Sequence, residues 1–282
     1  MISYAYVEGV GIDNIVKLQK RYKTKMRFML DSGAFTAFNT GKPIKIQDYC
    51  NFIKNTPIKL DNYIALDVIQ NAKETKKNYY KMLECGLRPM PVFTSGADIK
   101  DIDEYYSTSD YILVGGLVGV GKNSVIRRIA EIMEVIDGRK VHLLGFSQMK
   151  WVNKFRPYSI DSSSWLSGIR YGQVNILTDN PLMLSAATRK DFIKKPDKKL
   201  VKALHRVGVS AASLRKSNSW NSEGYSSTKK PLMTATARAR VYQAIEIEKK
   251  VGTKVYFALA STSGLEALVD AYEYLNERGV KL

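Results

Sequence analysis

Short apolar runs alternate with helical patterns along almost the whole chain, and this alternation limits the fold more than any other sequence feature. Each apolar run is followed by a polar or glycine-containing turn, which predicts strands at 2–7, 26–30, 63–66, 90–93, 111–114, 141–146, 158–160, 174–177 and 255–260. Amphipathic segments predict helices at 13–22, 46–55, 74–85, 124–136, 181–194, 200–216, 234–250 and 264–277.

About eight strand–helix units in 282 residues predict an α/β fold, a single (β/α)8 barrel of the TIM type, whose usual length is about 250 residues. A doubly wound open sheet is the alternative, because strand order cannot be read from a sequence. We expect one domain over residues 1–282, with a basic insertion or extension in its C-terminal half.

Positive charge is concentrated in one segment. The chain has 44 Lys and Arg against 27 Asp and Glu, a net charge of +17, and residues 189–240 contribute +11 of it, with 14 basic and three acidic residues. Because basic side chains release the counterions of phosphates, this segment predicts nucleic-acid binding. The expected contact residues are Lys198, Lys199, Lys202, Arg206, Arg215, Lys216 and Trp220. A solvated basic face without a partner is the alternative.

Two cysteines and two histidines predict neither a disulfide framework nor a structural zinc site, so no cofactor and no metal are expected. The sequence shows no secretory leader and no apolar stretch of about 18 residues, which predicts a cytoplasmic protein, in the host cytoplasm if a phage encodes it. His142 is expected to be structural, and His205 to lie on the surface or to contact phosphate. Neither has a Cys or Asp partner at a spacing typical of a nucleophile triad.

Three aspartates follow predicted strands: Asp31, Asp67 and Asp161. A fourth strand ends at a glycine pair, Gly115 and Gly116. In a parallel barrel these positions share one mouth, although a single Asp after a strand is more often a helix N-cap. Without metal ligands, such carboxylates suit nucleophilic and acid–base chemistry at an acetal-like carbon.

Five motifs occur in a particular order: DSGAF at 31–35, ALD at 65–67, VGGL at 114–117, HLLG at 142–145, and a stretch from SID at 159–161 to GQ at 172–173. This ordered set resembles the tRNA-guanine transglycosylases, also called queuine tRNA-ribosyltransferases. These enzymes are (β/α)8 barrels. They replace a guanine in nucleic acid by a 7-deazaguanine through a covalent aspartyl-ribosyl intermediate.

The resemblance implies a role for each matching residue. Asp161 would be the nucleophile and Asp31 the general acid/base. The base would lie between Phe35 and Leu144. Asp67 would recognise the base by accepting hydrogen bonds from N1–H and the exocyclic amine. The glycine pair Gly115 and Gly116 would bind its other edge, with the N–H of Gly116 donating to O6. Leu117 would lie near the 7-substituent.

Two departures from the family concern the polymer and the base. The chain has Thr94 and Ser95 where the family usually has a base-reading Gln, and no cysteine after Cys85 to build the zinc site of the tRNA enzymes. This pattern resembles the zinc-less phage and bacterial relatives that act on DNA. We therefore expect a DNA-guanine transglycosylase that inserts a 7-deazaguanine of the preQ0 type through an aspartyl-deoxyribosyl intermediate, with DNA and the free base as partners.

Three alternatives stay open. One is a tRNA-guanine transglycosylase. Another is a nucleotide-binding protein, because residues 116–124 nearly match the phosphate-binding loop GxxxxGK[ST]. The last is a non-catalytic basic DNA-binding protein whose aspartates are only helix caps.

Overall fold

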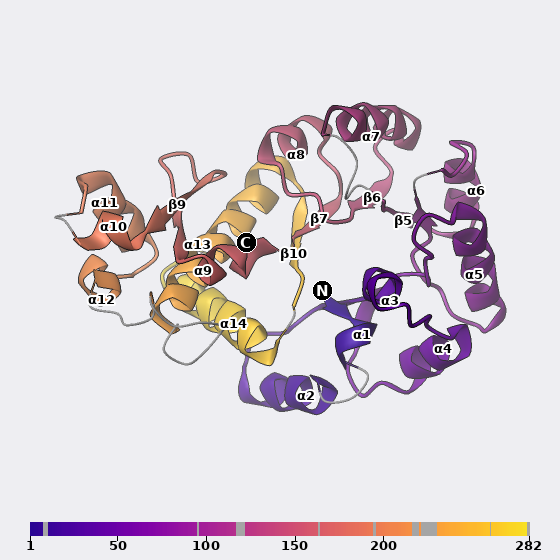
Figure 1. The fold of residues 1–282 in the computed structure, drawn as a ribbon, viewed down its shortest axis with the longest axis horizontal. Coiled ribbons are helices and arrows are strands. Elements are labelled where there is room, and N and C mark those ends of the chain that lie inside the picture. Colours follow the sequence, from indigo (N-terminus) through magenta and orange to yellow (C-terminus); the bar gives the residue numbers. More distant parts are fainter. Residues whose placement is uncertain are drawn as a thin grey trace. The chain divides into compact units, whose positions relative to one another are not determined.

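The computed structural model describes residues 1–7, 11–94, 96–116, 122–162, 164–193, 196–215, 220, 230–259 and 261–280. It confirms the α/β class, since helices alternate with strands that pair mostly in parallel (Figure 1). Contacts divide the chain into two compact units. Unit 1 is Met1–Ser162 with Tyr256–Thr262, and unit 2 is Ser163–Val255 with Ser263–Leu282.

Unit 1 contains the parallel strands, apart from the first two residues of one of them, Lys254 and Val255, and these strands form two sheets. One sheet has the order β1 (Ile2–Ser3), β2 (Phe28–Asp31) and β3 (Leu60–Tyr63). The other has the order β10 (Lys254–Phe257), β7 (Ser159–Ser162), β6 (Lys140–Leu143), β5 (Tyr111–Val114) and β4 (Val92–Phe93). Isolated parallel bridges pair Ile64 with Met90 and Ile2 with Leu259.

The helices of unit 1 follow its strands along the chain. They are α1 (Tyr4–Val7), α2 (Gly11–Arg21), α3 (Ala34–Thr40), α4 (Ile46–Asn55), α5 (Ala72–Glu84), α6 (Asp101–Thr108), α7 (Lys122–Ile136) and α8 (Met149–Phe155). Figure 1 shows α4 to α8 around the outside of the strands. All four residues of β5 are buried, as expected for a parallel strand that is covered on both faces.

Helix α5 illustrates how the local sequence dictates these elements. Its buried residues are Thr75, Asn78, Tyr79 and Met82, a spacing of three and four residues that places them on one face. The N-cap is Asn71, whose side-chain oxygen accepts a hydrogen bond from the backbone N–H of Glu74 at 3.0 Å. An amphipathic face and a capped N-terminus together fix α5 directly after the loop that carries Asp67.

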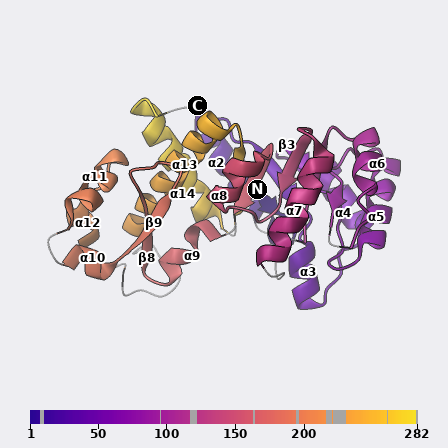
Figure 2. The same ribbon diagram turned by 90° about the horizontal axis from the view of Figure 1, so that it is seen from above.

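Unit 2 combines an antiparallel hairpin with helices. The hairpin is β8 (Gln173–Leu177) and β9 (Leu184–Thr188), and it lies alongside α13 (Lys230–Val251) in Figure 2. The other helical elements are η1 (Ser164–Leu166), α9 (Ser167–Arg170), α10 (Arg189–Ile193), α11 (Lys198–Arg206), α12 (Ala211–Arg215) and α14 (Thr262–Glu277). Val174, Phe192, Leu204 and Leu232 are fully buried in its core.

Three sequence predictions are corrected by these elements. The helix predicted at 181–194 is helical at 189–193, as α10, but residues 184–188 form β9, because backbone pairing with β8 outweighs the helix propensity of its alanines. The strand predicted at 174–177 therefore pairs antiparallel to β9 and joins neither parallel sheet. The helix predicted at 200–216 divides into α11 and α12 at Gly208, whose φ of +62° interrupts the helix.

Smaller differences concern short elements. The strand predicted at 2–7 ends at Ser3, where α1 begins, and helices α3, α6 and α8 were not predicted. Within the described part of the chain, no helix is both long enough and apolar enough to cross a membrane.

Candidate active site

The three aspartates of the sequence analysis lie at or just beyond the carboxyl ends of parallel strands of unit 1. Asp31 is the last residue of β2, Asp161 is the third residue of β7, and Asp67 lies four residues after the end of β3. The three side chains lie close enough for their charges to interact, since the negative charges of Asp67 and Asp161 both raise the pKa of Asp31. The structure therefore brings together the carboxylates that the sequence placed on separate strands.

Asp31 is poised to exchange a proton near neutral pH. Burial raises the pKa of Asp31 to about 7, the negative charge of Asp67 adds to the effect, and hydrogen bonds from Ser3 and Gly33 oppose it. The backbone N–H of Gly33 donates to Asp31 Oδ2 at 3.1 Å. Gly33 has a φ of +83°, and a Cβ there would lie 2.9 Å from that of Ala5, so a side chain does not fit this turn.

Asp67 is held by a residue that directly follows β2 and by the packing of α5. The hydroxyl of Ser32 donates to Asp67 Oδ1 at 2.6 Å, and burial raises the pKa of Asp67. The preceding residue, Leu66, is fixed at both backbone atoms: its carbonyl accepts from Asn78 Nδ2 at 3.1 Å, and its N–H donates to Met82 Sδ at 3.3 Å. Packing on α5 thus sets the position of Asp67.

Asp161 is buried, with 3% of its surface exposed, and one of its oxygens is fully engaged. Oδ1 accepts the backbone N–H of Gly145 at 2.6 Å and lies 3.2 Å from Nε2 of His142. Gly145 adopts a φ of +68°, a conformation that favours glycine and that turns its N–H toward the carboxylate. Oδ2 accepts no hydrogen bond from the described residues, which leaves that oxygen available for chemistry.

His142 is the residue of this site that sequence reasoning missed. The sequence predicts a structural role for His142 and no acidic partner. In the structure its ring is fully buried between Asp161 and Ser159, whose hydroxyl lies 2.5 Å from Nδ1. The partners are 17 and 19 residues away in the sequence. The sequence signal that points to this contact is the alternation of side chains along β7, which places Ser159 and Asp161 on the same face of the strand. In the structure Ser159 pairs in register with His142 on β6.

The residues expected to hold a base lie after β2, β5 and β6. Phe35 on α3 is 61% exposed, which leaves its ring open to a ligand, and Leu144 is half-buried. Gly115 is buried next to Leu144, since a Cβ on it would lie 3.9 Å from Leu144 Cδ2. Gly116 is exposed and has a φ of +68°. Leu117 lies outside the described residues.

The expected nucleic-acid contacts divide into exposed and engaged side chains. Lys198, Lys199 and Lys202 on α11 are exposed, as is Arg215 on α12. Arg206 instead donates to the carbonyl of Thr178 at 2.9 Å and lies over the ring of Tyr242.

Trp220 is also engaged within unit 2. Its indole N–H donates to the carbonyl of Leu214 at 2.9 Å, and its ring lies against Phe192. Core packing therefore occupies the side chain that was expected to stack on bases. Lys216 lies outside the described residues, as does most of the segment 116–124 that nearly matches a phosphate-binding loop.

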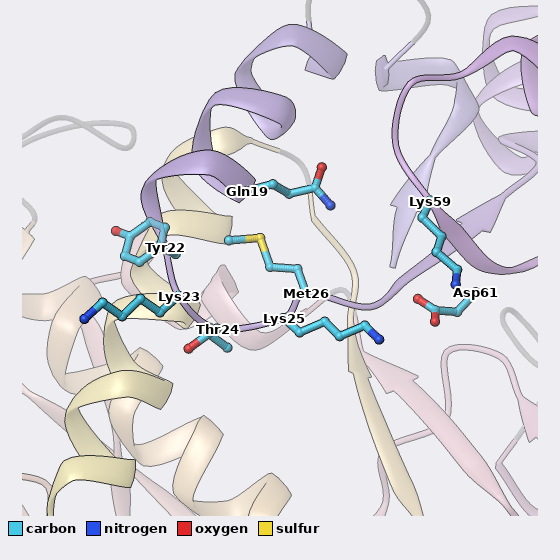
Figure 3. Close-up of a pocket in the computed structure, with 8 residues that line it drawn as sticks. All are labelled: Gln19, Tyr22, Lys23, Thr24, Lys25, Met26, Lys59 and Asp61. Carbon is cyan, nitrogen blue, oxygen red and sulfur yellow. The ribbon is translucent and has the colours of Figure 1, made fainter.

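A separate pocket of about 240 Å³ lies at the amino ends of β2 and β3, the opposite strand ends from the aspartates (Figure 3). It is lined by Gln19, Tyr22, Lys23, Thr24, Lys25, Met26, Lys59 and Asp61. In Figure 3 the ammonium groups of Lys23 and Lys25 point away from each other, so these cations do not converge on one ligand.

Within the described ranges, no group of three or more His, Cys, Asp or Glu side chains is placed to hold a metal ion. The chain matches no family model, no curated protein and no solved structure. The chemically reactive side chains of the candidate site are the carboxylates of unit 1. They combine a group that titrates near neutral pH, Asp31, with a second, buried carboxylate whose orientation is fixed, Asp161.

Proposed function

We propose that this protein is a DNA-guanine transglycosylase that replaces a guanine by a 7-deazaguanine of the preQ0 type. The observation that carries the proposal is the grouping of Asp31, Asp67 and Asp161, in which the described part of the chain donates hydrogen bonds to Asp161 through Oδ1 alone. The ordered motifs and the basic segment support the same function.

The proposed reaction has two displacement steps. Asp161 Oδ2 attacks C1′ of the deoxyribose, a C1′–O bond forms, and the C1′–N9 bond breaks with its electron pair leaving on guanine. Asp31, whose pKa of about 7 allows the protonated form, supplies a proton to the departing base. The incoming 7-deazaguanine then returns a proton to Asp31, its N9 attacks C1′, and Asp161 is released.

Recognition of the base would use the groups around these carboxylates. The edge of guanine presents two adjacent donors, N1–H and the exocyclic amine, and a carboxylate such as Asp67 accepts both. Gly116, exposed and without a side chain, lets its backbone N–H approach O6. The exposed ring of Phe35 offers one stacking face, and Leu144 the other.

DNA is the proposed polymer because the chain has no cysteine after Cys85 to build the zinc site of the tRNA enzymes. The exposed lysines of α11 suit contact with its phosphates. A base within duplex DNA would have to leave the stack to reach buried carboxylates, at a cost of a few kcal/mol. The exposed basic residues of segment 189–240, such as Lys198, Lys199 and Lys202, offer contacts that offset such a cost.

We also propose that the eight parallel strands close into a (β/α)8 barrel. The bridge between Ile64 and Met90 lies where the end of β3 meets the start of β4, and the bridge between Ile2 and Leu259 lies where β10 meets β1. Hydrogen bonds support both bridges, because Ala65 N–H donates to the Met90 carbonyl at 2.9 Å and Leu259 N–H to the Met1 carbonyl at 3.0 Å. In such a barrel the aspartates share the carboxyl-end mouth.

The function is tested by base exchange. The purified protein is incubated with radiolabelled guanine or preQ0 and with duplex DNA, single-stranded DNA or tRNA. We expect label to enter DNA, and Asp161→Asn to abolish both the exchange and the covalent DNA adduct seen by mass spectrometry. Incorporation into tRNA alone would reassign the polymer, and incorporation into none of the three would remove the enzyme assignment. Asp179→Asn, which changes an exposed aspartate of unit 2, is the matched control.

A further inference from the structure

Behind Asp161 lies a chain of buried polar side chains that the proposed reaction does not use. The hydroxyl of Tyr111 on β5 is hydrogen-bonded to the hydroxyl of Ser159 on β7. Ser159 Oγ lies 2.5 Å from Nδ1 of His142 on β6, and His142 Nε2 lies 3.2 Å from Asp161 Oδ1. The rings of Tyr158 and Tyr256 pack edge-on against Tyr111 and His142 respectively.

The direction of these hydrogen bonds follows from counting hydrogens. Burial raises the pKa of Tyr111, so its hydroxyl keeps a hydrogen to donate. Among the described residues, Ser159 is the acceptor within reach of that hydroxyl, and His142 Nδ1 is then the acceptor left for the hydrogen of Ser159. The reverse direction would leave the tyrosine hydrogen without an acceptor in a buried site, which is costly.

We infer that His142 is a positioning residue for Asp161, locked by Tyr111 and Ser159 in the tautomer that carries its proton on Nε2. Nδ1 accepts from Ser159, so Nε2–H donates to Asp161 Oδ1. With Gly145 N–H on the same oxygen, both donors hold Oδ1 and direct Oδ2 toward the reacting carbon. The catalytic consequence rests on the proposed function, whereas the tautomer does not.

The tautomer can be measured without any activity. The chain has two histidines, so His205→Gln leaves a single imidazole, and two-bond ¹H–¹⁵N correlation spectra distinguish Nε2–H from Nδ1–H directly. We expect the Nε2–H form in the His205→Gln protein, and a mixture of tautomers once Ser159→Ala or Tyr111→Phe is added. Observation of Nδ1–H, or of a ring protonated at both nitrogens, in the otherwise unchanged protein would overturn the inference.

The kinetic test separates positioning from simple support of the fold. We expect Ser159→Ala to lower kcat for base exchange by about 10- to 100-fold, the usual effect of losing a partner that orients a functional group, with little change in KM for DNA. His142→Phe should lower kcat at least as much, and His142→Gln should recover part of the rate because its amide N–H can replace Nε2–H.

The outcomes of the two experiments are distinguishable. An unchanged kcat in Ser159→Ala, or equal losses in His142→Phe and His142→Gln, would show that the ring only fills space. If the unaltered protein exchanges no base, the proposed function fails, while the spectra still decide whether the hydrogen-bonded chain fixes His142.

Discussion

At the scale of single residues, the carboxylates of unit 1 differ in what holds them. Asp31 sits among negative charges with a pKa of about 7, whereas Asp161 receives N–H groups on one oxygen. A proton donor and a nucleophile need these opposite environments, because the first must hold a proton near neutral pH and the second must present a free lone pair. The difference comes from burial and neighbours rather than from residue type.

The pKa of Asp31 makes a prediction about stability. Its folded-state pKa of about 7 exceeds the ordinary value of 3.8 for an aspartate, so between these pH values the unfolded chain releases a proton that the folded chain keeps. Asp31 therefore lowers the free energy of unfolding as the pH rises from about 4 to 7, by up to about 4 kcal/mol, with no further loss above pH 7.

Asp31→Asn should remove this dependence. In urea unfolding at pH 4 to 8, the stability of Asp31→Asn relative to the unaltered protein should increase with pH and level off above pH 7. The exposed carboxylate of Asp179 gives the matched control, since Asp179→Asn should show no such trend. A constant difference between Asp31→Asn and the unaltered protein across this range would contradict a raised pKa.

At the scale of elements, strand ends carry the site and helix packing holds those ends in place. Asp67 depends on α5 through Asn78 and Met82, and Asp161 depends on the turn after β6 through Gly145. Parallel pairing matters because it gathers the carboxyl ends of all these strands at one edge of each sheet. Closure of the proposed barrel requires the two sheets to be joined at both edges.

Amide hydrogen exchange tests that closure. In a closed barrel, the amides of Ala65, Met90 and Leu259 are expected to exchange as slowly as Gly115, whose N–H donates to the Phe93 carbonyl inside a sheet. Gly41, at the C-terminal cap of α3, gives a reference for a helix end that frays. Exchange of Ala65 or Leu259 as fast as Gly41 would show that the sheets open at that edge.

At the scale of the whole molecule, the carboxylates proposed for chemistry and the basic segment lie in different units. The three aspartates belong to unit 1, and the basic segment 189–240 belongs to unit 2. The buried face of α11 consists of Leu200, Ala203 and Leu204, and the exposed lysines of this helix lie outside that face. Their charge can therefore be removed without disturbing the core.

Neutralising these lysines should weaken DNA binding and its salt dependence. Changing Lys198, Lys199 and Lys202 together to Gln is expected to reduce the slope of log Kobs against log [salt] by about 0.9 for each lost phosphate contact. The rate of base exchange at saturating DNA should not change. The control is the same triple change at the exposed Lys17, Lys20 and Lys54 of unit 1, which alters the net charge equally. An equal loss of slope in the control would show that the net charge of the protein, and not contact by α11, causes the effect.

The sequence by itself determined the α/β class, most helix and strand positions, the location of the positive charge and the three aspartates at strand ends. Those features depend on neighbours along the chain, through hydrophobic period, turn residues and charge. Only the tertiary structure decided that 184–188 pairs as a strand, that packing occupies Trp220, and that His142 meets Asp161. Contacts between residues far apart in the chain set those features, and no local pattern specifies which strands become neighbours.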